Sequence, residues 1–507
     1  MRRKTIIWLI VVTVILALVA AVIAILRFIA EPDPYVAMYE EQCSTCHGDR
    51  MQGTPTLGPP LVGNELRHGD SVAELRESIA NGFPLTGMPA WSTSLSEAEI
   101  QGLAIFVAER RVDRVFTDFK FEEPLQIPEN VVSTDLHDFR VEVVANGIDP
   151  LPFSIAPLPD GRILVTEKTR GLRIVSPEGK LSELVQGTPR VYADEVMVYG
   201  VAYGIGWMLD VAPHPDYEDN GWIYLHYTER CEDCDGTLPV SMNTLVRGRI
   251  QDGTWVDQEL IWQADKSFYS IVPDAGAGGR IAFDGAGHVF ISVGLKGDSN
   301  YEGIQDLTQP SGKIHRVHDD GRIPADNPFV DVAGAFHSTW TYGHRSPQGL
   351  EFNHRSGRLW GTEMGPRGGD ELNLLLPGRN YGWPLYSKGL DYDGTPVEYG
   401  EDLGIEFDMA DIQQPVVDFT PSPAISSFIF YEGEQFPRWQ NHAIIGSLKG
   451  TELYRIELKD NKLLRSETLL SRLARIRDIE TGPDGNIYLL LEHAEGGQIV
   501  RLIPAPG

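Results

Sequence analysis

The sequence predicts a mainly β protein, a six-bladed β-propeller preceded by a small all-α domain and an N-terminal hydrophobic helix. Three observations lead to this prediction. A strand-turn-strand pattern occurs six times after about residue 141, a Cys-x-x-Cys-His motif lies near the N-terminus, and an uncharged apolar run precedes both. The predicted parts are an anchor at residues 5–30, a helical domain at 35–112, a linker at 113–140 and the propeller at 141–505.

Composition excludes some classes of protein. The 507 residues are 42% hydrophobic, enough to build a buried core, so wholesale disorder is excluded. The 72 acidic residues outnumber the 43 basic ones and give a net charge of −29. Because such a surface repels polyanions, we expect no nucleic-acid partner.

The apolar run near the N-terminus is long enough to cross a membrane. Residues 6–26 are 21 consecutive uncharged residues, and a spanning helix needs about 20. A cleaved signal peptide, the alternative, usually has an apolar region of about 7–15 residues. Basic residues precede the run and acidic residues follow it, which favours an N-in orientation. We therefore predict a single-pass anchor in the cytoplasmic membrane, with the domains on the periplasmic or extracellular side.

The Cys-x-x-Cys-His motif predicts covalent attachment of haem c. Thiols at the spacing of Cys43 and Cys46 can bond to the two vinyl groups of one haem, and His47 then binds the iron. The rigid loop at residues 58–63 contains Pro59, whose carbonyl can accept a hydrogen bond from Nδ1 of His47 and fix the ring.

A second iron ligand must come from elsewhere in the same region. Met88 is favoured because it lies in a loop bounded by Gly and Pro, where a methionine is poorly placed for core packing. Met51 and His68 are rival ligands. Residues 35–112 resemble a class I c-type cytochrome, with the motif, the Met88 loop and a closing helix in the family's order. In that helix Ile100, Leu103, Phe106 and Val107 predict one face packed on the haem.

The second half of the chain repeats one pattern of short apolar runs joined by a turn. The copies begin near residues 155, 209, 281, 350, 426 and 479, about 55–75 residues apart. A strand-turn-strand unit repeated six times at this spacing predicts a six-bladed β-propeller. The Pro-punctuated, acidic residues 113–140 show no clear period and are interpreted as a linker.

Residues 343–384 resemble the signature of the soluble-type quinoprotein aldose (glucose/sorbosone) dehydrogenases, and the resemblance extends over about 141–505. The family implies a propeller that binds pyrroloquinoline quinone (PQQ) and calcium. Positions that match its cofactor-binding cations are Arg345, Lys449, Arg475 and Arg477. A planar guanidinium suits this task because it pairs with carboxylates bidentately.

The calcium sites implied by the resemblance also have matching positions. The backbone carbonyls of Gly365 and Pro366 match an active-site calcium, and hard oxygen ligands are what calcium requires. Glu371 and the carbonyl of Tyr381 match a structural calcium site, which Asp391 would join.

The departures from the family pattern concentrate at the catalytic positions. The general base of the family, a His, corresponds to Gly276, and a nearby acidic residue corresponds to Leu295. Ile205, Met364 and Ser346 replace further polar residues of the pattern. Glycine takes no proton, so sugar oxidation needs another base. Asp274 and His288 are candidates, with Lys296 and Asp298 on a loop expected to face the same mouth.

Two classes of function follow from these patterns. The first is a membrane-anchored quinohaemoprotein dehydrogenase that oxidises an aldose sugar or another alcohol and passes electrons through its haem to a respiratory acceptor. The second is an electron-transfer cytochrome whose propeller has lost catalysis and serves as a binding or docking module.

The remaining cysteines, Cys231 and Cys234, favour a small disulfide loop over a metal site, which would need two more ligands.

Overall fold

The structure is a computed structural model that describes residues 33–114, 119–198, 200–234, 238–296 and 301–505. This part of the chain divides into two compact units. The first holds the residues up to Asp113 together with Leu390–Pro396, and the second holds Arg114–Gly389 and the residues from Val397 onward. None of the helices among the described residues is long and apolar enough to span a membrane. The predicted anchor at residues 5–30 lies outside them.

The first unit is helical, as predicted. Its helices are α2 (Pro34–Gln42), α3 (Ser44–His47), α4 (Val72–Asn81) and α5 (Glu97–Arg111), with 3-10 turns η1 (Pro84–Thr86) and η2 (Trp91–Thr93). Capping boxes start the two longer helices: Ser71 and Glu74 exchange hydrogen bonds at α4, and Ser96 and Glu99 do so at α5. Each box satisfies backbone N–H groups that a helix start leaves without partners.

Helix α5 is the core of this unit. The four residues predicted to form its apolar face are buried, but Ala104, Ile105 and Ala108 are buried as well, so burial extends well beyond one face. Helix α2 crosses α5 at Gly102, where a Cβ atom would lie 1.9 Å from the Tyr35 ring. Glycine is required there because any side chain would separate the two helices.

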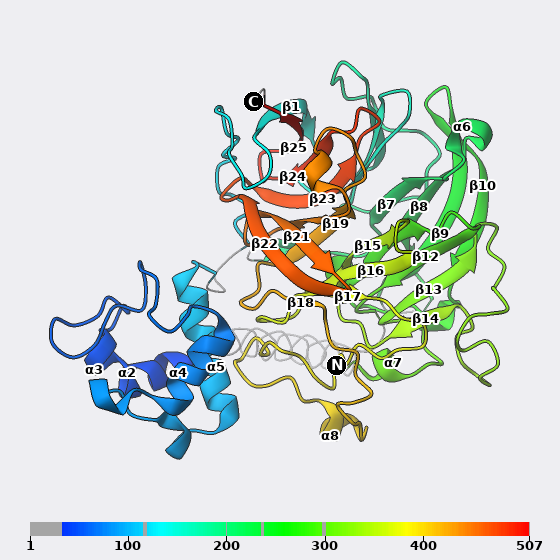
Figure 1. The fold of residues 1–507 in the computed structure, drawn as a ribbon. Helices are drawn as coiled ribbons and strands as arrows, with labels where there is room; N and C mark the ends of the chain where they lie inside the picture. The colour runs from blue at the N-terminus through cyan, green and yellow to red at the C-terminus, as the bar shows by residue number, and fades with distance from the viewer. Residues whose placement is uncertain (1–32, 115–118, 199, 235–237, 297–300, 506–507) are drawn as a thin grey trace, which may run out of the picture. The chain divides into compact units, whose positions relative to one another are not determined.

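The second unit is a six-bladed propeller (Figure 1), as the repeats predicted. The strands of the first three blades are β2 (Pro152–Pro157), β3 (Ile163–Glu167) and β4 (Gly171–Val175); β7 (Met208–Pro213), β8 (Ile223–Cys231), β9 (Val240–Gln251) and β10 (Thr254–Gln263); and β11 (Gly278–Phe283), β12 (His288–Val293), β13 (Lys313–His318) and β14 (Thr339–Tyr342). Those of the last three are β15 (Pro347–Asn353), β16 (Arg358–Glu363), β17 (Glu371–Leu374) and β18 (Val417–Asp418); β19 (Ile425–Phe430), β20 (Ala443–Ser447), β21 (Leu453–Lys459) and β22 (Lys462–Leu470); and β23 (Arg475–Thr481), β24 (Ile487–Glu492), β25 (Gly497–Pro504) and β1 (Phe139–Ile148).

Each repeat found in the sequence corresponds to the first two strands of one blade. The six first strands β2, β7, β11, β15, β19 and β23 contact their neighbours in a closed ring around a central channel. The last blade is completed by β1, which pairs antiparallel with β25. The sequence analysis did not anticipate this closure, because one apolar strand after a linker carries no signal of its distant partner.

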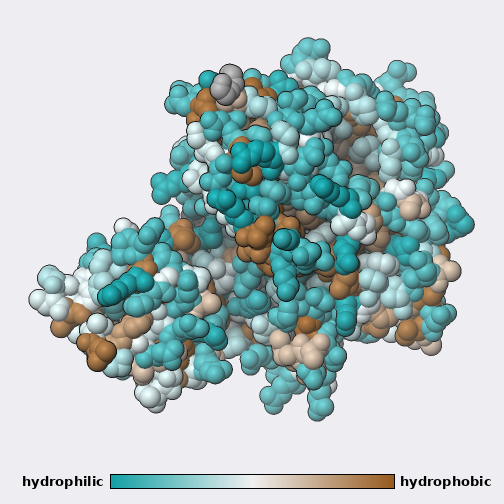
Figure 2. Space-filling view, in the orientation of Figure 1, coloured by the Kyte–Doolittle hydropathy of each residue, from teal (hydrophilic) through white to brown (hydrophobic). Residues whose placement is uncertain are grey.

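Shorter elements lie in the connections between strands, both within a blade and between blades. They are the hairpin β5 (Val196–Val198) and β6 (Val201–Tyr203), the helices α6 (Tyr217–Asn220), α7 (Glu302–Gln305) and α8 (Gly400–Leu403), and the 3-10 turns η3 (Lys266–Phe268), η4 (Asp274–Gly276) and η5 (Pro437–Trp439). The surface face in Figure 2 is largely hydrophilic, in keeping with the acidic composition.

Candidate functional site

The helical unit presents the haem-attachment residues at one turn. Cys43 and Cys46 are free thiols, each partly buried, on either side of the start of α3. Nδ1 of His47 lies 2.9 Å from the carbonyl oxygen of Pro59, as expected. Because this contact uses Nδ1, Nε2 is the ring nitrogen available to an iron. The motif therefore fits covalent haem.

The three candidates for the second iron ligand have different surroundings. Met88 is partly buried in the loop after η1, and its backbone pairs with Phe83. Met51 is only 2% exposed and belongs to the apolar core of the unit. His68 stacks on the ring of Phe83 with the centroids 4.0 Å apart. Met51 is thus a packing residue, and Met88 stays the preferred ligand.

The four predicted cofactor-binding cations converge on one end of the propeller channel. In every blade the first strand starts, and the antiparallel second strand finishes, at the same end, which we call the mouth. Arg345 precedes β15, Lys449 follows β20, and Arg475 and Arg477 lie at the start of β23. These four cations, together with Gly365 and Pro366 after β16, therefore line the mouth.

One carboxylate organises the cations of the last blade. The two oxygens of Glu492, at the end of β24, accept from Nε of Arg475 and Nε of Arg477 at 2.8 Å each. Nζ of Lys168, which follows β3, lies 3.2 Å from Oε1 of the same group. The positive charge of the three cations holds the pKa of Glu492 well below its usual range, against the effect of its burial. Three buried basic side chains thus share one anion, and the two guanidinium groups alone outweigh its charge, which suits a ligand with several carboxylates.

Lys168 is a site residue that the sequence analysis missed. Burial and the neighbouring Arg477 lower the pKa of its amine to about 7. Lys168 stands alone in the strand-end sequence Thr-Glu-Lys-Thr, where a lysine is ordinarily a surface charge. Only its pairing with Glu492, more than 300 residues away, identifies it.

The two remaining cations lie on the fourth and fifth blades. Arg345 is 9% exposed; its guanidinium lies 5.2 Å from the Trp383 ring centre, and Nη1 donates to the carbonyl of Gly365 over 3.3 Å. Lys449 is 5% exposed, and its charge acts on Asp370. Burial nevertheless raises the pKa of Asp370 to about 6.

The predicted calcium ligands are backbone carbonyls and isolated carboxylates. Among the residues that the structure describes, no group of three His, Cys, Asp or Glu side chains is arranged to hold a metal. Burial and the negative charge of neighbouring Glu363 raise the pKa of Glu371 to about 8. A cation would relieve this repulsion, so the position fits calcium. Asp391 belongs to Leu390–Pro396, which groups with the helical unit and not with the unit of Glu371 and Tyr381.

The position of the family base is closed by a leucine. A Cβ atom on residue 276 would lie 3.2 Å from Cβ and 3.3 Å from Cδ1 of Leu295. Leu295 is partly buried and packs near Ile304 and Trp383. The sequence analysis treated Gly276 and Leu295 as two separate departures from the family pattern. In the structure they form one feature, because the side chain of Leu295 packs against the small residue at position 276.

The candidate substitute bases do not face an open site. Asp274 is 3% exposed; it accepts from Nζ of Lys296 at 2.9 Å and from the N–H of Gly206 at 2.7 Å. Lys296 is 2% exposed, so it points into this cluster and not into the mouth, contrary to expectation. Asp298 lies outside the described residues.

His288 is at the wrong end of its strand for catalysis at the mouth. It begins β12, whereas Val293 at the other end pairs with Gly278 beside the mouth. Its Nδ1 lies 2.7 Å from Oδ2 of Asp284, and Arg316 contacts the same ring. His288 is therefore a structural residue, and the prediction that it serves as a base finds no geometric support.

Below the mouth a buried ion pair spans the channel. Nη1 of Arg280 on β11 donates to Asp478 on β23, the opposite strand of the ring, over 2.7 Å. Nε donates to the carbonyl of Gln348 over 2.7 Å, and Asp210 lies 3.5 Å from Nη1. This network forms a polar floor beneath the cations.

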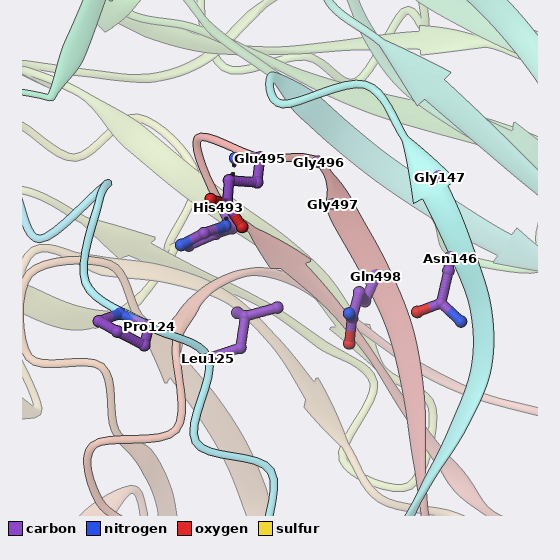
Figure 3. Close-up of a pocket in the computed structure, with 9 residues that line it drawn as sticks. All are labelled: Pro124, Leu125, Asn146, Gly147, His493, Glu495, Gly496, Gly497 and Gln498. Carbon is purple, nitrogen blue, oxygen red and sulfur yellow. Dashed lines mark hydrogen bonds between the residues drawn. The ribbon is translucent and has the colours of Figure 1, made fainter.

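Two further features lie at the edge of the propeller. Cys231 and Cys234 form a disulfide, as the sequence favoured. A cavity of about 330 Å³ lies between Pro124 and Leu125 of the linker and the turn that holds His493 (Figure 3).

Comparison with known proteins assigns each of the two parts of the chain to a family. Residues 150–501 match the family described as Glucose / Sorbosone dehydrogenase, and residues 30–107 match cytochrome c oxidase, cbb3-type, subunit III. A cationic propeller and a haem-binding domain in one chain define a class of redox proteins. The chain belongs to the glucose/sorbosone dehydrogenase family and carries an N-terminal cytochrome c domain of the cbb3 type.

Individual relatives cover one or the other part. Aldose sugar dehydrogenase YliI of Escherichia coli is 35% identical over 72% of this chain and 93% of its own length. The PQQ-bound aldose sugar dehydrogenase of Streptomyces coelicolor superimposes with a TM-score of 0.54 at 26% identity, over 72% of this chain and 98% of that one. The cbb3-type oxidase subunit CcoP of Azospirillum brasilense is 40% identical over 14% of this chain and 25% of its length.

Proposed function

We propose that the protein is a quinohaemoprotein dehydrogenase that oxidises an aldose sugar or another alcohol with PQQ and passes the electrons to its own haem c. The observation that carries the proposal is the set of three buried cations around Glu492 at the mouth, completed by Arg345 and Lys449. A similar protein has been solved with PQQ bound. When bound, the quinone supplies a two-electron acceptor for the substrate carbon.

The residues of the mouth have separable tasks. Arg475, Arg477 and Lys168 would bind the carboxylates of the cofactor, because together they carry more positive charge than Glu492 balances. Gly365 and Pro366 would offer carbonyl oxygens to calcium. The Arg280 floor holds the start of β23 in place, through its hydrogen bond to the carbonyl of Arg477 at 3.1 Å.

The closed position of the family base points to a substrate other than glucose. Gly276 takes no proton, and Leu295 makes this side of the mouth apolar. We infer weak turnover on glucose and better turnover on a less polar alcohol, because an apolar wall leaves the hydroxyl groups of a sugar without partners.

The anchor and the electron acceptor complete the proposal. Residues 5–30 would hold the protein in the cytoplasmic membrane with both domains outside, where a respiratory acceptor takes electrons from the haem. Membrane extraction should require detergent, and N-terminal sequencing should begin at or near Met1. A mature chain that starts near residue 31 would contradict the anchor.

The alternative function is that of an electron-transfer cytochrome that carries electrons for a partner, with a propeller that serves only as a binding or docking module. The closed position of the family base favours this alternative.

Titration calorimetry of the full chain with PQQ and calcium distinguishes the dehydrogenase from the docking module. Arg477→Ala should weaken binding by about tens to thousands of fold, equivalent to roughly 2–5 kcal/mol. Arg501→Ala, on the exposed outer face of the last blade, is the matched control. If neither the wild type nor the control binds PQQ, the docking function replaces the dehydrogenase.

A further inference from the structure

The linker between the units runs across the mouth. Nη1 of Arg475 donates to the carbonyl oxygen of Phe119 over 2.5 Å, and the N–H of Ala494 donates to the carbonyl of Phe121 over 3.0 Å. The N–H of Gln126 then donates to the carbonyl of Leu473 over 2.9 Å. We call residues 119–121 the strap. Its backbone is thus fixed to loops of the last blade that also carry the cofactor-binding cations.

The side chains of the strap cover the mouth itself. The guanidinium of Arg475 lies 5.5 Å from the ring centre of Phe119 and 5.9 Å from that of Phe121. Phe121 packs against an apolar cluster from the first three blades, and this cluster consists of Leu151, Phe153, Ala202, Trp207, Leu209 and Ala277. Ala277 is adjacent to the vacant base position, and Lys168 lies 5.9 Å from the centre of the Phe153 ring. The strap therefore occupies the space above both the cations and the base position.

With the strap in place, every nitrogen of the Arg475 guanidinium already has one partner. Nε and Nη2 both pair with Glu492 at 2.8 Å, and Nη1 bonds to Phe119. A planar guanidinium binds a carboxylate through two adjacent N–H groups. A cofactor carboxylate that approaches Arg475 from the Nη1 side would therefore compete with the Phe119 carbonyl for this guanidinium.

Two features allow the strap to move. Lys120, between the two aromatic residues, has a φ of 56°, in the left-handed region that costs a side-chain-bearing residue free energy. Beyond it, Pro124 and Leu125 border the cavity of about 330 Å³ on one side (Figure 3), while Leu125 also packs against the apolar cluster of the last two blades. Release of the strap relieves the strained residue, and the cavity gives the neighbouring chain room to shift.

We propose that the strap is an intramolecular occupant of the quinone site, which PQQ displaces when it binds, so that Phe119 and Phe121 determine which ligands gain access to the mouth. This inference rests on the proposed function, because it names the residues that compete with the cofactor. The proposal predicts that PQQ binding and release of the strap from the mouth are coupled, so that each molecule that binds PQQ also exposes its linker.

The first test is PQQ affinity of the full chain by titration calorimetry with calcium present. Replacing both rings (Phe119→Ala with Phe121→Ala) removes most of the apolar contact that holds the strap. The Kd for PQQ should fall by about tenfold or more, given the free energy of burying one aromatic side chain. Phe407→Ala, a 40% exposed ring on another loop, is the matched control and should leave the Kd unchanged.

The second test detects movement of the strap without any activity measurement. Trypsin cleaves after lysine only where the backbone is released from its contacts. Saturation with PQQ should accelerate cleavage after Lys120 by at least severalfold, giving a haem-stained N-terminal fragment and a propeller fragment that begins at Phe121. Lys120→Gln abolishes this product and confirms the site of cleavage.

The outcomes distinguish the two proposals. Tighter binding by the double variant with faster cleavage of the wild type supports the strap. If PQQ binds the wild type but neither its affinity in the double variant nor cleavage at Lys120 changes, the strap is a fixed wall and the inference is overturned, while the dehydrogenase proposal stands. If neither the wild type nor the double variant binds PQQ, both proposals are overturned.

Discussion

The N–H of Leu295 donates a hydrogen bond to the carbonyl of Gly276 over 2.8 Å, and the Leu295 side chain fills the space beside residue 276. A side chain at residue 276 would therefore compete for space with Leu295. A base on residue 276 needs room that Leu295 occupies, and a polar residue at 295 would lack the apolar neighbours that Leu295 now has. Residues 276 and 295 thus form one packed feature at the mouth.

We therefore expect Gly276→His alone to fail as a rescue of aldose oxidation. Its Cβ would already lie 3.2 Å from Leu295, so the variant should lose about 1–3 kcal/mol of stability through overpacking. Gly276→His combined with Leu295→Asp removes the obstruction and should raise the rate of haem reduction by glucose. Stopped-flow absorbance of the PQQ- and calcium-loaded protein measures this rate. A faster rate in the single variant would contradict the obstruction.

Glu492 should be essential to the stability of the mouth. Glu492→Gln leaves Lys168, Arg475 and Arg477 without their shared anion and should lower the free energy of unfolding by about 3–5 kcal/mol. Because the pKa of Glu492 is lower in the folded protein than its ordinary value of 4.5, this stabilisation is present above pH 4.5 and is lost as the pH falls through the folded pKa. Urea unfolding at several pH values measures both effects.

The control for this measurement is a carboxylate in an exposed pair. Glu142 contacts Arg501 over 3.0 Å with its side chain 45% exposed. Glu142→Gln should cost no more than about 1 kcal/mol. Equal losses in the two variants would show that the Glu492 cluster contributes no more than a surface ion pair.

Lys168 should make PQQ binding take up a proton above neutral pH. Its pKa in the folded protein is about 7, so at pH 8 most of the amine is neutral. A cofactor carboxylate favours the charged form and raises this pKa, which draws up to about one proton from the buffer at pH 8 and very little at pH 6. Calorimetry in two buffers of different ionisation enthalpy gives the number of protons, and Lys168→Gln should abolish the uptake. Uptake that is unchanged in this variant would assign the proton to another residue.

The two methionines of the haem unit should respond in opposite ways. Met88→Ala should abolish the sulfur-to-iron charge-transfer band and lower the reduction potential, because the iron loses its thioether ligand. Met51→Ala should retain the band but lose about 2–5 kcal/mol of stability, because Met51 is 2% exposed in the core. Absorbance spectra and urea unfolding of both variants measure these effects, and an exchange of the two results would make Met51 the ligand.

Much of the architecture could be predicted from the sequence, because it depends on patterns of residues that lie close together along the chain. The Cys43-to-His47 motif, the six turn signatures and the positions of Arg345, Lys449, Arg475 and Arg477 are each local in sequence. The resemblance to a family pattern also led to the prediction that Gly276 occupies the position of the general base. Closure of the ring by β1 was not predictable in this way, since its partner β25 lies about 350 residues further along the chain.

What the sequence determined by itself is which residue types are available: a haem motif, a repeated blade and a surplus of cations at strand ends. Only the tertiary structure decided which of these residues contact one another. Asp274 and Lys296, both candidates for the mouth, neutralise each other in a buried pair. Lys168, which no motif marked, joins Glu492 because β3 and β24 finish at the same end of neighbouring blades. Charge pairing is set by distance in space, and in a closed ring of blades that distance bears no relation to separation along the chain.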